Sequence, residues 1–184
     1  MKHLLATYLL LAFTLIAYSQ EEQPYFQQEV NYDIEVELND QKHELNAFEK
    51  VTYKNNSTKT LHSIYFHIWP NAYKNYKTAL CKQKLEVRDT KLYHAEDSIL
   101  GSIDGLEFKV NDEKLEWNYH AEYEDVCIVY LLEPLKPGET VEITTPFKVK
   151  IPKGIFSRLG HMDKSYQITQ WYPKPAVYDK DGWH

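Results

Sequence analysis

The sequence is poor in arginine and richer in acidic than in basic residues. Only Arg88 and Arg158 are arginines among its 21 Lys and Arg residues, against 27 Asp and Glu, so the formal net charge is −6. Planar guanidinium groups read phosphates and base edges, and nucleic-acid-binding proteins carry basic surfaces. The shortage of arginine and the negative charge therefore exclude nucleic acid as a partner.

The familiar catalytic and metal-binding motifs are also missing. The sequence has no G-x-S-x-G nucleophile elbow, no phosphate-binding P-loop and no C-x-x-C pair. His43 and Glu44 begin like H-E-x-x-H, but the fourth residue after His43 is Ala47 and the surrounding pattern is that of a strand. His62 and His67 are five residues apart in a predicted strand, so they point to opposite faces. We predict no catalytic residue and no metal ligand in this chain.

Cysteine is scarce, because the chain contains only Cys81 and Cys127, which are 46 positions apart. That spacing matches no metal-binding motif. Cys127 lies in the apolar run 126–129, where a buried thiol is expected. A disulfide between the two cysteines is the alternative in an oxidising compartment.

The amino terminus has no apolar run of the ~20 residues that a membrane-spanning helix needs. Its uncharged run, residues 4–17, has 14 residues and follows Lys2 and His3. Small residues, Ala17 and Ser19, then stand at positions −3 and −1 before Gln20, which is typical of a secretory signal peptide. We predict a signal peptide at 1–19, a mature domain at 20–184, and export to the periplasm, the outer membrane or the medium. An uncleaved membrane anchor is the alternative.

The mature segment has a β pattern. Apolar and charged residues alternate without a break over residues 32–38, as in a half-buried strand. Further predicted strands, separated by turn residues, cover 45–54, 61–69, 108–110, 115–119, 126–132 and 140–149. We expect hairpins at 108–119 and 126–149, and a short helix or a long loop within 72–100. The prediction is an all-β, antiparallel β-sandwich.

Aromatic residues are abundant, with 15 tyrosines and 4 tryptophans. They suit wet sheet faces and interfaces, and a carbohydrate-binding module would show the same excess. Residues 154–179 combine aromatics, glutamines and prolines with little alternation. Such a composition is typical of a ligand subsite. An irregular segment that fills the core is the alternative.

Two segments carry a resemblance to a known family. Residues 61–73 read LHSIYFHIWPNAY, and residues 166–184 read YQITQWYPKPAVYDKDGWH. Together they resemble the amino-terminal domain of aminopeptidase N-like (gluzincin) zinc metallopeptidases, above all the exported Bacteroidetes branch. The resemblance extends from about Tyr32 to His184. It implies a saddle-like β-sandwich that precedes a thermolysin-like catalytic domain, with its last segment lining the substrate cleft.

The resemblance also implies a substrate-binding residue. In the family, a glutamine of the last segment helps to hold the free amino group of the peptide substrate. Gln170 is the match that we favour and Gln167 is the alternative, because the register before Trp171 is open.

The family's catalytic motifs, G-x-M-E-N and H-E-x-x-H, do not occur in the chain. We therefore expect a fragment truncated before the catalytic domain, inactive alone and without a cofactor of its own. Zinc would be bound in the complete parent enzyme, whose catalytic domain would be the partner of this chain and whose substrate would be a peptide N-terminus. A stand-alone secreted β-sandwich that binds carbohydrate or a protein partner is the alternative function.

Overall fold

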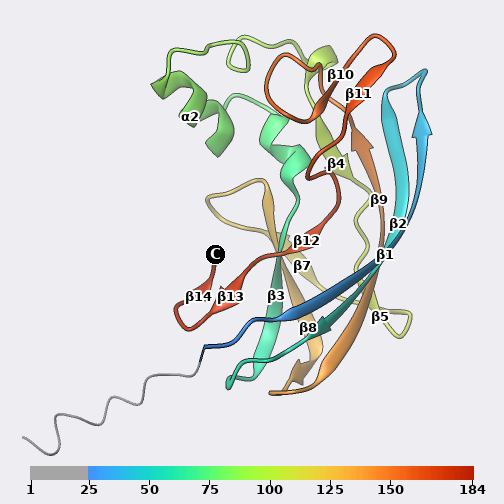
Figure 1. Cartoon of the computed structure of the whole chain (residues 1–184), viewed down its shortest axis with the longest axis vertical. Coiled ribbons are helices and arrows are strands. Elements are labelled where there is room, and N and C mark those ends of the chain that lie inside the picture. Colours follow the sequence, from blue (N-terminus) through green and yellow to red (C-terminus); the bar gives the residue numbers. More distant parts are fainter. Residues whose placement is uncertain (1–24) are drawn as a thin grey trace, which may run out of the picture.

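The computed structural model describes residues 25–184, so the predicted signal peptide lies outside the described residues. Two antiparallel sheets form the body of the molecule (Figure 1). The larger sheet has the order β1 (Glu29–Asn39), β2 (Glu44–Lys54), β9 (Thr140–Lys150), β5 (Lys109–Val110), β6 (Glu113–Lys114), and β4 (Ser102–Asp104) also pairs with β9. The smaller sheet has the order β12 (Lys174–Pro175), β3 (Leu61–His67), β8 (Val126–Leu135), β7 (Trp117–Tyr119). The predicted all-β antiparallel fold is confirmed.

The remaining elements are short. Two separate hairpins are formed by β10 (Gly160–Met162) with β11 (Ser165–Gln167), and by β13 (Tyr178–Asp179) with β14 (Gly182–Trp183). The helical elements are η1 (Trp69–Tyr73), α2 (Ala79–Glu86) and η2 (Asp97–Ile99). Of the two alternatives for residues 72–100, α2 shows that the segment holds a short helix. Figure 1 shows α2 and the β10–β11 hairpin at the same end of the sandwich.

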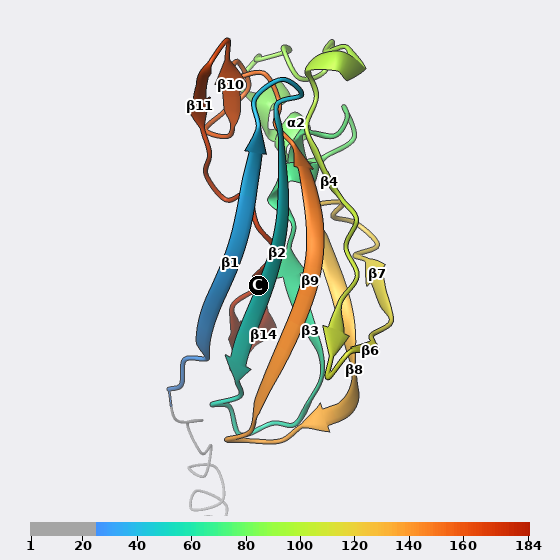
Figure 2. The ribbon, with the colours of Figure 1, turned by 90° about the vertical axis from the view of Figure 1, so that its right-hand side faces the viewer.

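The alternation in the sequence becomes the inner and outer faces of the larger sheet. β1 and β2 pair along their whole length, from Glu29 opposite Lys54 to Asn39 opposite Glu44 (Figure 2). On β2 every second residue faces inward, and Leu45, Val51 and Tyr53 are buried. Successive side chains of a strand point to opposite faces, so a strand with a single covered face alternates buried and exposed residues.

The main core lies between the two sheets. It is built from large side chains such as Ile64 and Phe66 of β3, Val129 of β8, and Ile143 and Val149 of β9. Burying one such side chain stabilises the fold by roughly 1.5–3 kcal/mol. A smaller cluster lies at the end of the sandwich that carries α2. Among residues 25–184 no helix is long and apolar enough to span a bilayer.

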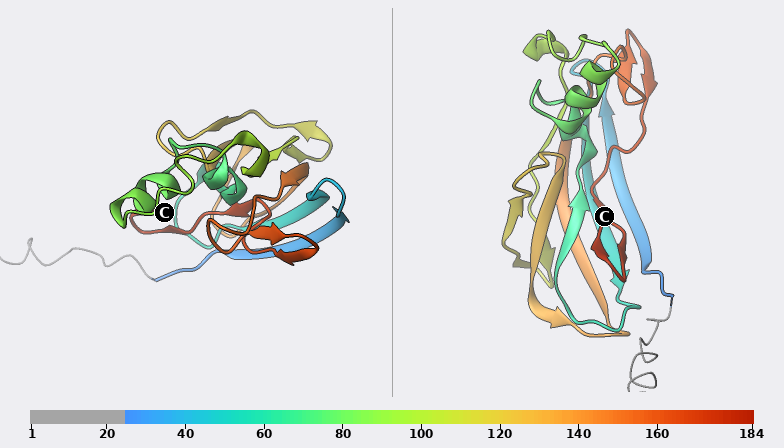
Figure 3. Two further views of the ribbon diagram at one scale, coloured as in Figure 1. Left: turned by 90° about the horizontal axis from the view of Figure 1, so that it is seen from above. Right: turned by 90° about the vertical axis from the view of Figure 1, so that its left-hand side faces the viewer.

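The predicted hairpin at 126–149 is wrong. β8 pairs with β3 and β7, whereas β9 pairs with β2, β4 and β5, so the connection crosses from one sheet to the other (Figure 3). The crossing loop is held by Asn55, whose amide donates to Glu139 O at 2.9 Å and whose carbonyl accepts from Gly138 N at 2.7 Å. The turn residues show only that the chain reverses. They do not show whether it reverses within one sheet or between two.

The predicted hairpin at 108–119 is also shorter than expected. Asn111 and Asp112, with φ of 51° and 67°, form a two-residue connection between β5 and β6. Asn and Asp tolerate the left-handed backbone that such tight turns need. β7 leaves for the smaller sheet. The predicted strand 61–69 ends at His67, because Pro70 lies in the first turn of η1 and cannot donate a sheet hydrogen bond.

The two cysteines are free thiols, so the alternative of a disulfide is wrong. Cys127 lies in the main core and Cys81 in the smaller cluster. Burial raises the pKa of both thiols, that of Cys127 to about 12, with a further contribution from the charge of Glu49.

We therefore expect neither thiol to react readily with a disulfide reagent such as DTNB in the native protein, because the thiolate is the reactive form. Measured by absorbance at pH 8, the folded protein should release less than one equivalent of thionitrobenzoate. The urea-unfolded protein should release two. Rapid release of two equivalents from the folded protein would contradict this.

Candidate functional site

The candidate site consists of two neighbouring hollows at the end of the sandwich beneath α2. The first has a volume of about 530 Å³ and the second about 400 Å³. Both are lined by Trp69, Ala79 and Asp125. The first hollow adds side chains from residues 157–158 and 169–170, and the second adds side chains from β3, from β14 and from the 120–126 segment.

Trp69 at the start of η1 contacts both His67 and Lys174. The His67 ring stacks on it at 4.8 Å, and Lys174 Nζ lies 4.6 Å from its centroid. Lys174 reaches this position because β12 pairs with β3, with Lys174 opposite His67 and Ala176 N donating to Tyr65 O at 2.8 Å. The pairing brings together the two sequence segments that carry the family resemblance.

Asn71 fixes the position of η1. Its side chain is fully buried, its Nδ2 donates to Glu124 O at 3.1 Å, and its Oδ1 accepts from Ile103 N at 3.1 Å. The amide of Ile68 donates to Asp125 O at 2.8 Å. These hydrogen bonds join residues 68–71, at η1, to β4 and to the loop that carries Asp125.

The two candidate glutamines lie in different places. Gln170 lines the first hollow, is exposed, and has a left-handed backbone with φ of 53°. Next to it, Thr169 Oγ1 donates to Arg158 O at 3.1 Å, and both of these residues also line the hollow. Gln167 is exposed at the end of β11, opposite Gly160, and is not among the lining residues.

The segment 154–179 packs against the main core and also lines the first hollow. Trp171 packs on Phe147 with ring centroids 5.9 Å apart, and Tyr172 packs edge-on against Tyr32 at 5.3 Å. These rings fill the space beside the main core. Gln170, immediately before them, faces the hollow. The core contacts of the aromatic pair therefore fix the position of the polar residue.

The second hollow has mainly aromatic walls. Tyr65 and Trp183 stack with centroids 5.4 Å apart and an interplanar angle of 5°, and His120 stacks on Tyr123 at 5.1 Å. Burial lowers the pKa of His67; the positive charge of Lys174 acts in the same direction, while the His184 backbone and Asp125 oppose it. His67 is thus held largely neutral near pH 7.

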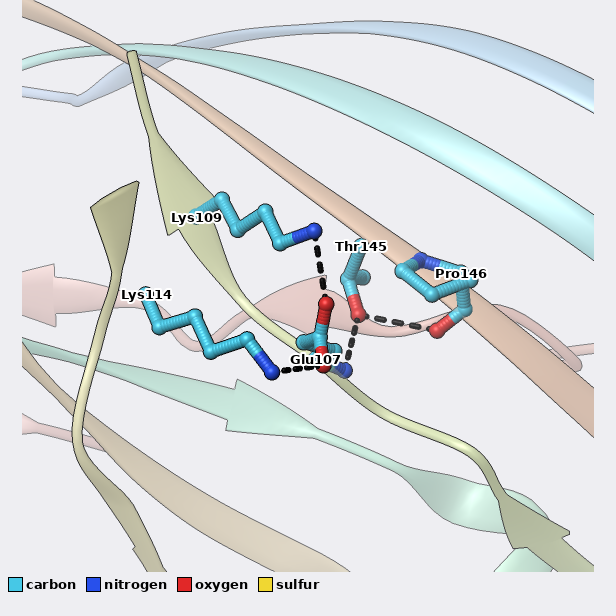
Figure 4. A network of polar contacts seen from close by, with 5 residues as sticks. All are labelled: Glu107, Lys109, Lys114, Thr145 and Pro146. Atoms are coloured by element: carbon cyan, nitrogen blue, oxygen red, sulfur yellow. Dashed lines mark hydrogen bonds and ion pairs between the residues drawn. The ribbon is translucent and has the colours of Figure 1, made fainter. Parts of the chain in front are cut away.

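The two hollows are lined by aromatic side chains and by polar groups such as Gln170 and Asp125. Within residues 25–184 no group of three or more His, Cys, Asp and Glu side chains is arranged to hold a metal ion. An ionic network lies elsewhere, at β5 and β6 (Figure 4), where Glu107, just before β5, contacts Lys109 at 2.6 Å and Lys114 at 2.5 Å. Those two lysines lower the pKa of Glu107 to about 2. The charges of this network are paired; Glu107 and Lys109 are half-buried and Lys114 is exposed, which is typical of a structural network at the surface.

Sequence reasoning did not single out Asp125 as a member of the site. Its local context is a turn between β7 and β8, where an acidic residue is ordinary. Only the approach of η1 and α2, which come from a distant part of the chain, makes Asp125 part of both hollows.

No protein-family model matches the chain, and a comparison with curated proteins finds no match. Among solved structures, a mutant of a two-domain M1 zinc metallopeptidase bound to L-tryptophan is 14% identical with a TM-score of 0.40, covering 70% of this chain and 22% of that one. An M1 zinc metallopeptidase mutant from Deinococcus radiodurans is 13% identical with a TM-score of 0.42, covering 72% and 23%. A mutant of a two-domain M1 zinc metallopeptidase bound to L-arginine is 13% identical with a TM-score of 0.41, covering 70% of this chain and 22% of that one. The chain spans less than a quarter of the length of these structures.

Proposed function

We propose that this chain is a noncatalytic amino-terminal β domain of an exported, aminopeptidase N-like zinc metallopeptidase and that it lines the substrate cleft of the complete enzyme. One observation carries the proposal. The segments 61–73 and 166–184, which hold the two family-like motifs, come together through the β3–β12 pairing and line the same hollow with Trp69 and Gln170. If the likeness of the two short motifs to the family were due to chance, there would be no reason for the motifs to meet at the same hollow.

The role proposed for Gln170 is to position the substrate. A neutral amide carries out no acid–base chemistry near pH 7, but its oxygen accepts hydrogen bonds from a peptide ammonium group. In the complete enzyme, zinc held by the catalytic domain would polarise the scissile carbonyl and activate water. Gln170 would hold the amino terminus in register for that step, and orientation of this kind increases the rate.

The first test is the coding sequence that follows His184. The proposal expects an in-frame continuation that encodes H-E-x-x-H and G-x-M-E-N. In the complete enzyme, Gln170→Ala should lower kcat/KM by about 10- to 100-fold, because a hydrogen bond to a charged group contributes about 1.5–3 kcal/mol. Gln167→Ala is the matched control and should leave kcat/KM within about twofold. Equal effects of the two substitutions would contradict the role assigned to Gln170.

The chain alone should be inactive. We expect purified residues 1–184, or the exported form, to show no zinc-dependent hydrolysis of an aminoacyl-arylamide, because the described residues hold no metal-binding cluster. Zinc-dependent turnover that a chelator abolishes would overturn this expectation. Amino-terminal sequencing of the exported protein tests the proposed cleavage after Ser19.

The aromatic walls of the second hollow support a second candidate, a stand-alone secreted module that binds carbohydrate. Tyr123 at its rim is 46% exposed, and sugar-binding sites often use exposed aromatic rings as stacking surfaces. A stop codon after His184, together with retention on an insoluble polysaccharide that Tyr123→Ala abolishes, would favour this candidate over the first.

A further inference from the structure

The chain between residues 157 and 170 makes one excursion from the first hollow and back to it. Its two stems line the hollow, Ser157 and Arg158 on the way out and Thr169 and Gln170 on the way back. Its distal part is the β10–β11 hairpin, which lies beside the β1–β2 turn at the end of the sandwich (Figure 1). Whatever holds the hairpin against that turn therefore also controls the position of one wall of the hollow.

Two histidines make the contact between the hairpin and the turn. The rings of His43, in the turn, and His161, on β10, stack with centroids 3.6 Å apart and an interplanar angle of 16°. His43 Nδ1 lies 2.7 Å from the hydroxyl of Tyr166 on β11, and that hydroxyl donates to Asp40 O at 3.3 Å. His161 is only 6% exposed, and its Nδ1 has no hydrogen-bond partner.

We propose that this contact is a pH-sensitive latch, closed while at most one of the two imidazoles is protonated and open when both are. A single proton is tolerated, since a protonated His43 donates from Nδ1 to the Tyr166 hydroxyl, which in turn donates to Asp40 O. A second proton places two cations in stacked rings, one of which, His161, is buried with its Nδ1 unpaired. Separation of the hairpin from the turn gives both rings access to water.

Most groups around His161 lower its pKa in the closed form, and this favours opening of the latch in acid. Burial lowers the pKa of His161, and His43 and Lys153 add to that effect, while Asp163 in the β10–β11 turn opposes it. Burial and the nearby Asp40 raise the pKa of Tyr166, so its hydroxyl keeps its proton over the relevant range. Because His161 binds a proton more weakly in the closed form than in the open form, acid favours the open form.

Opening would reach the hollow through the stems. Thr169 Oγ1 donates to Arg158 O at 3.1 Å and joins the two stems directly at the wall of the hollow. His161 N donates to Pro152 O and Gly154 N donates to His161 O, both at 2.9 Å, so the first stem is anchored on one side of the latch. The second stem contains Ile168 and leads to Trp171, and both of these side chains pack against the main core. The latch thus couples acidity to the position of the β10–β11 hairpin, whose two stems line the first hollow.

Methionine offers a specific probe, because the chain has only two methionines and Met162 lies on β10 next to His161. The full chain would be labelled with ¹³C-methyl methionine, and Met162→Leu would assign the signals. On lowering the pH from 7.5 to 5, the Met162 methyl resonance should shift in one steep transition that takes up more than one proton. The Met1 signal should not follow it.

Three variants decide whether the histidine pair is responsible. His161→Phe keeps a stacked ring but cannot be protonated, and His43→Asn suits the left-handed backbone at this position, with φ of 54°. Both should lose the Met162 transition. His62→Phe, at an exposed histidine on β3, is the matched control and should keep it. If His161→Phe fails to fold, His43→Asn alone gives the answer.

Two outcomes would overturn the latch. One is a Met162 resonance that does not move between pH 7.5 and 5. The other is a transition that persists in His43→Asn or His161→Phe, because the titrating group would then lie elsewhere. Both readouts come from this chain alone, so they are independent of whether it belongs to a peptidase.

Discussion

Replacing Glu49 by Gln is expected to remove a large loss of stability that the protein suffers as the pH rises. Relative to Glu49→Gln, the free energy of unfolding of the wild type should fall by about 1.4 kcal/mol per pH unit between roughly pH 4.5 and 9. Between pH 5 and 8 this amounts to about 4 kcal/mol. Urea unfolding of both proteins at a series of pH values measures the difference.

The expectation follows from the position of Glu49 in the core. It lies on the inward face of β2, is fully buried, and neither carboxyl oxygen has a hydrogen-bond partner. Burial raises its pKa from the ordinary 4.5 to about 9. The folded protein therefore keeps this proton up to about pH 9, whereas the unfolded chain releases it near pH 4.5. Across that interval the folded state binds more protons, so its stability falls as the pH rises.

The matched control for this prediction is Glu35→Gln. Glu35 points outward from β1 and is exposed, so its substitution should leave the pH dependence unchanged. A constant difference between wild type and Glu49→Gln at every pH would show that Glu49 ionises normally in the folded protein.

Replacing Asn71 by Ala is expected to destabilise the protein by about 3 kcal/mol. The substitution leaves Ile103 N and Glu124 O without the partners that Asn71 provides, and each unsatisfied buried group costs about 1–3 kcal/mol. Urea unfolding should show a lower midpoint with an unchanged slope, which identifies a change in stability alone. The effect should be accompanied by loosening of η1, and with it of Trp69 in both hollows.

Asn118→Ala is the control for Asn71. Asn118 lies on β7 and is exposed, so its removal should change stability by less than about 0.5 kcal/mol. A loss below about 1 kcal/mol for Asn71→Ala would mean that water or a small shift of the backbone replaces both hydrogen bonds.

Local patterns predicted those parts of the fold that local geometry decides. The alternation in residues 32–38 predicted the centre of β1, and residues 45–54 predicted nearly all of β2. A strand covered on one face imposes its period of two on the sequence directly. The position of chain reversals was likewise readable, as at Asn111 and Asp112, because turn residues act over two or three positions.

Strand partners could not be predicted in the same way. β8 and β9 each have an inward apolar face that either sheet could bury, and the loop between them fits a crossing as well as a hairpin. The assignment depends on how β3 and β2 fill the space opposite, which involves residues far away in the chain. The candidate site shares this property, since the hollows around Asp125 are completed by η1 and α2, which come from a distant part of the chain.

The sequence by itself determined that this protein is all-β and antiparallel and where several of its strands and turns lie. These properties depend on composition and on short-range backbone geometry. Only the tertiary structure decided that Glu49 is buried without a partner, that His43 stacks on His161, and that Gln170 shares a hollow with Trp69. The burial of Glu49 and the two contacts all depend on segments that are distant in the chain, so they are set by tertiary packing, which no local pattern contains.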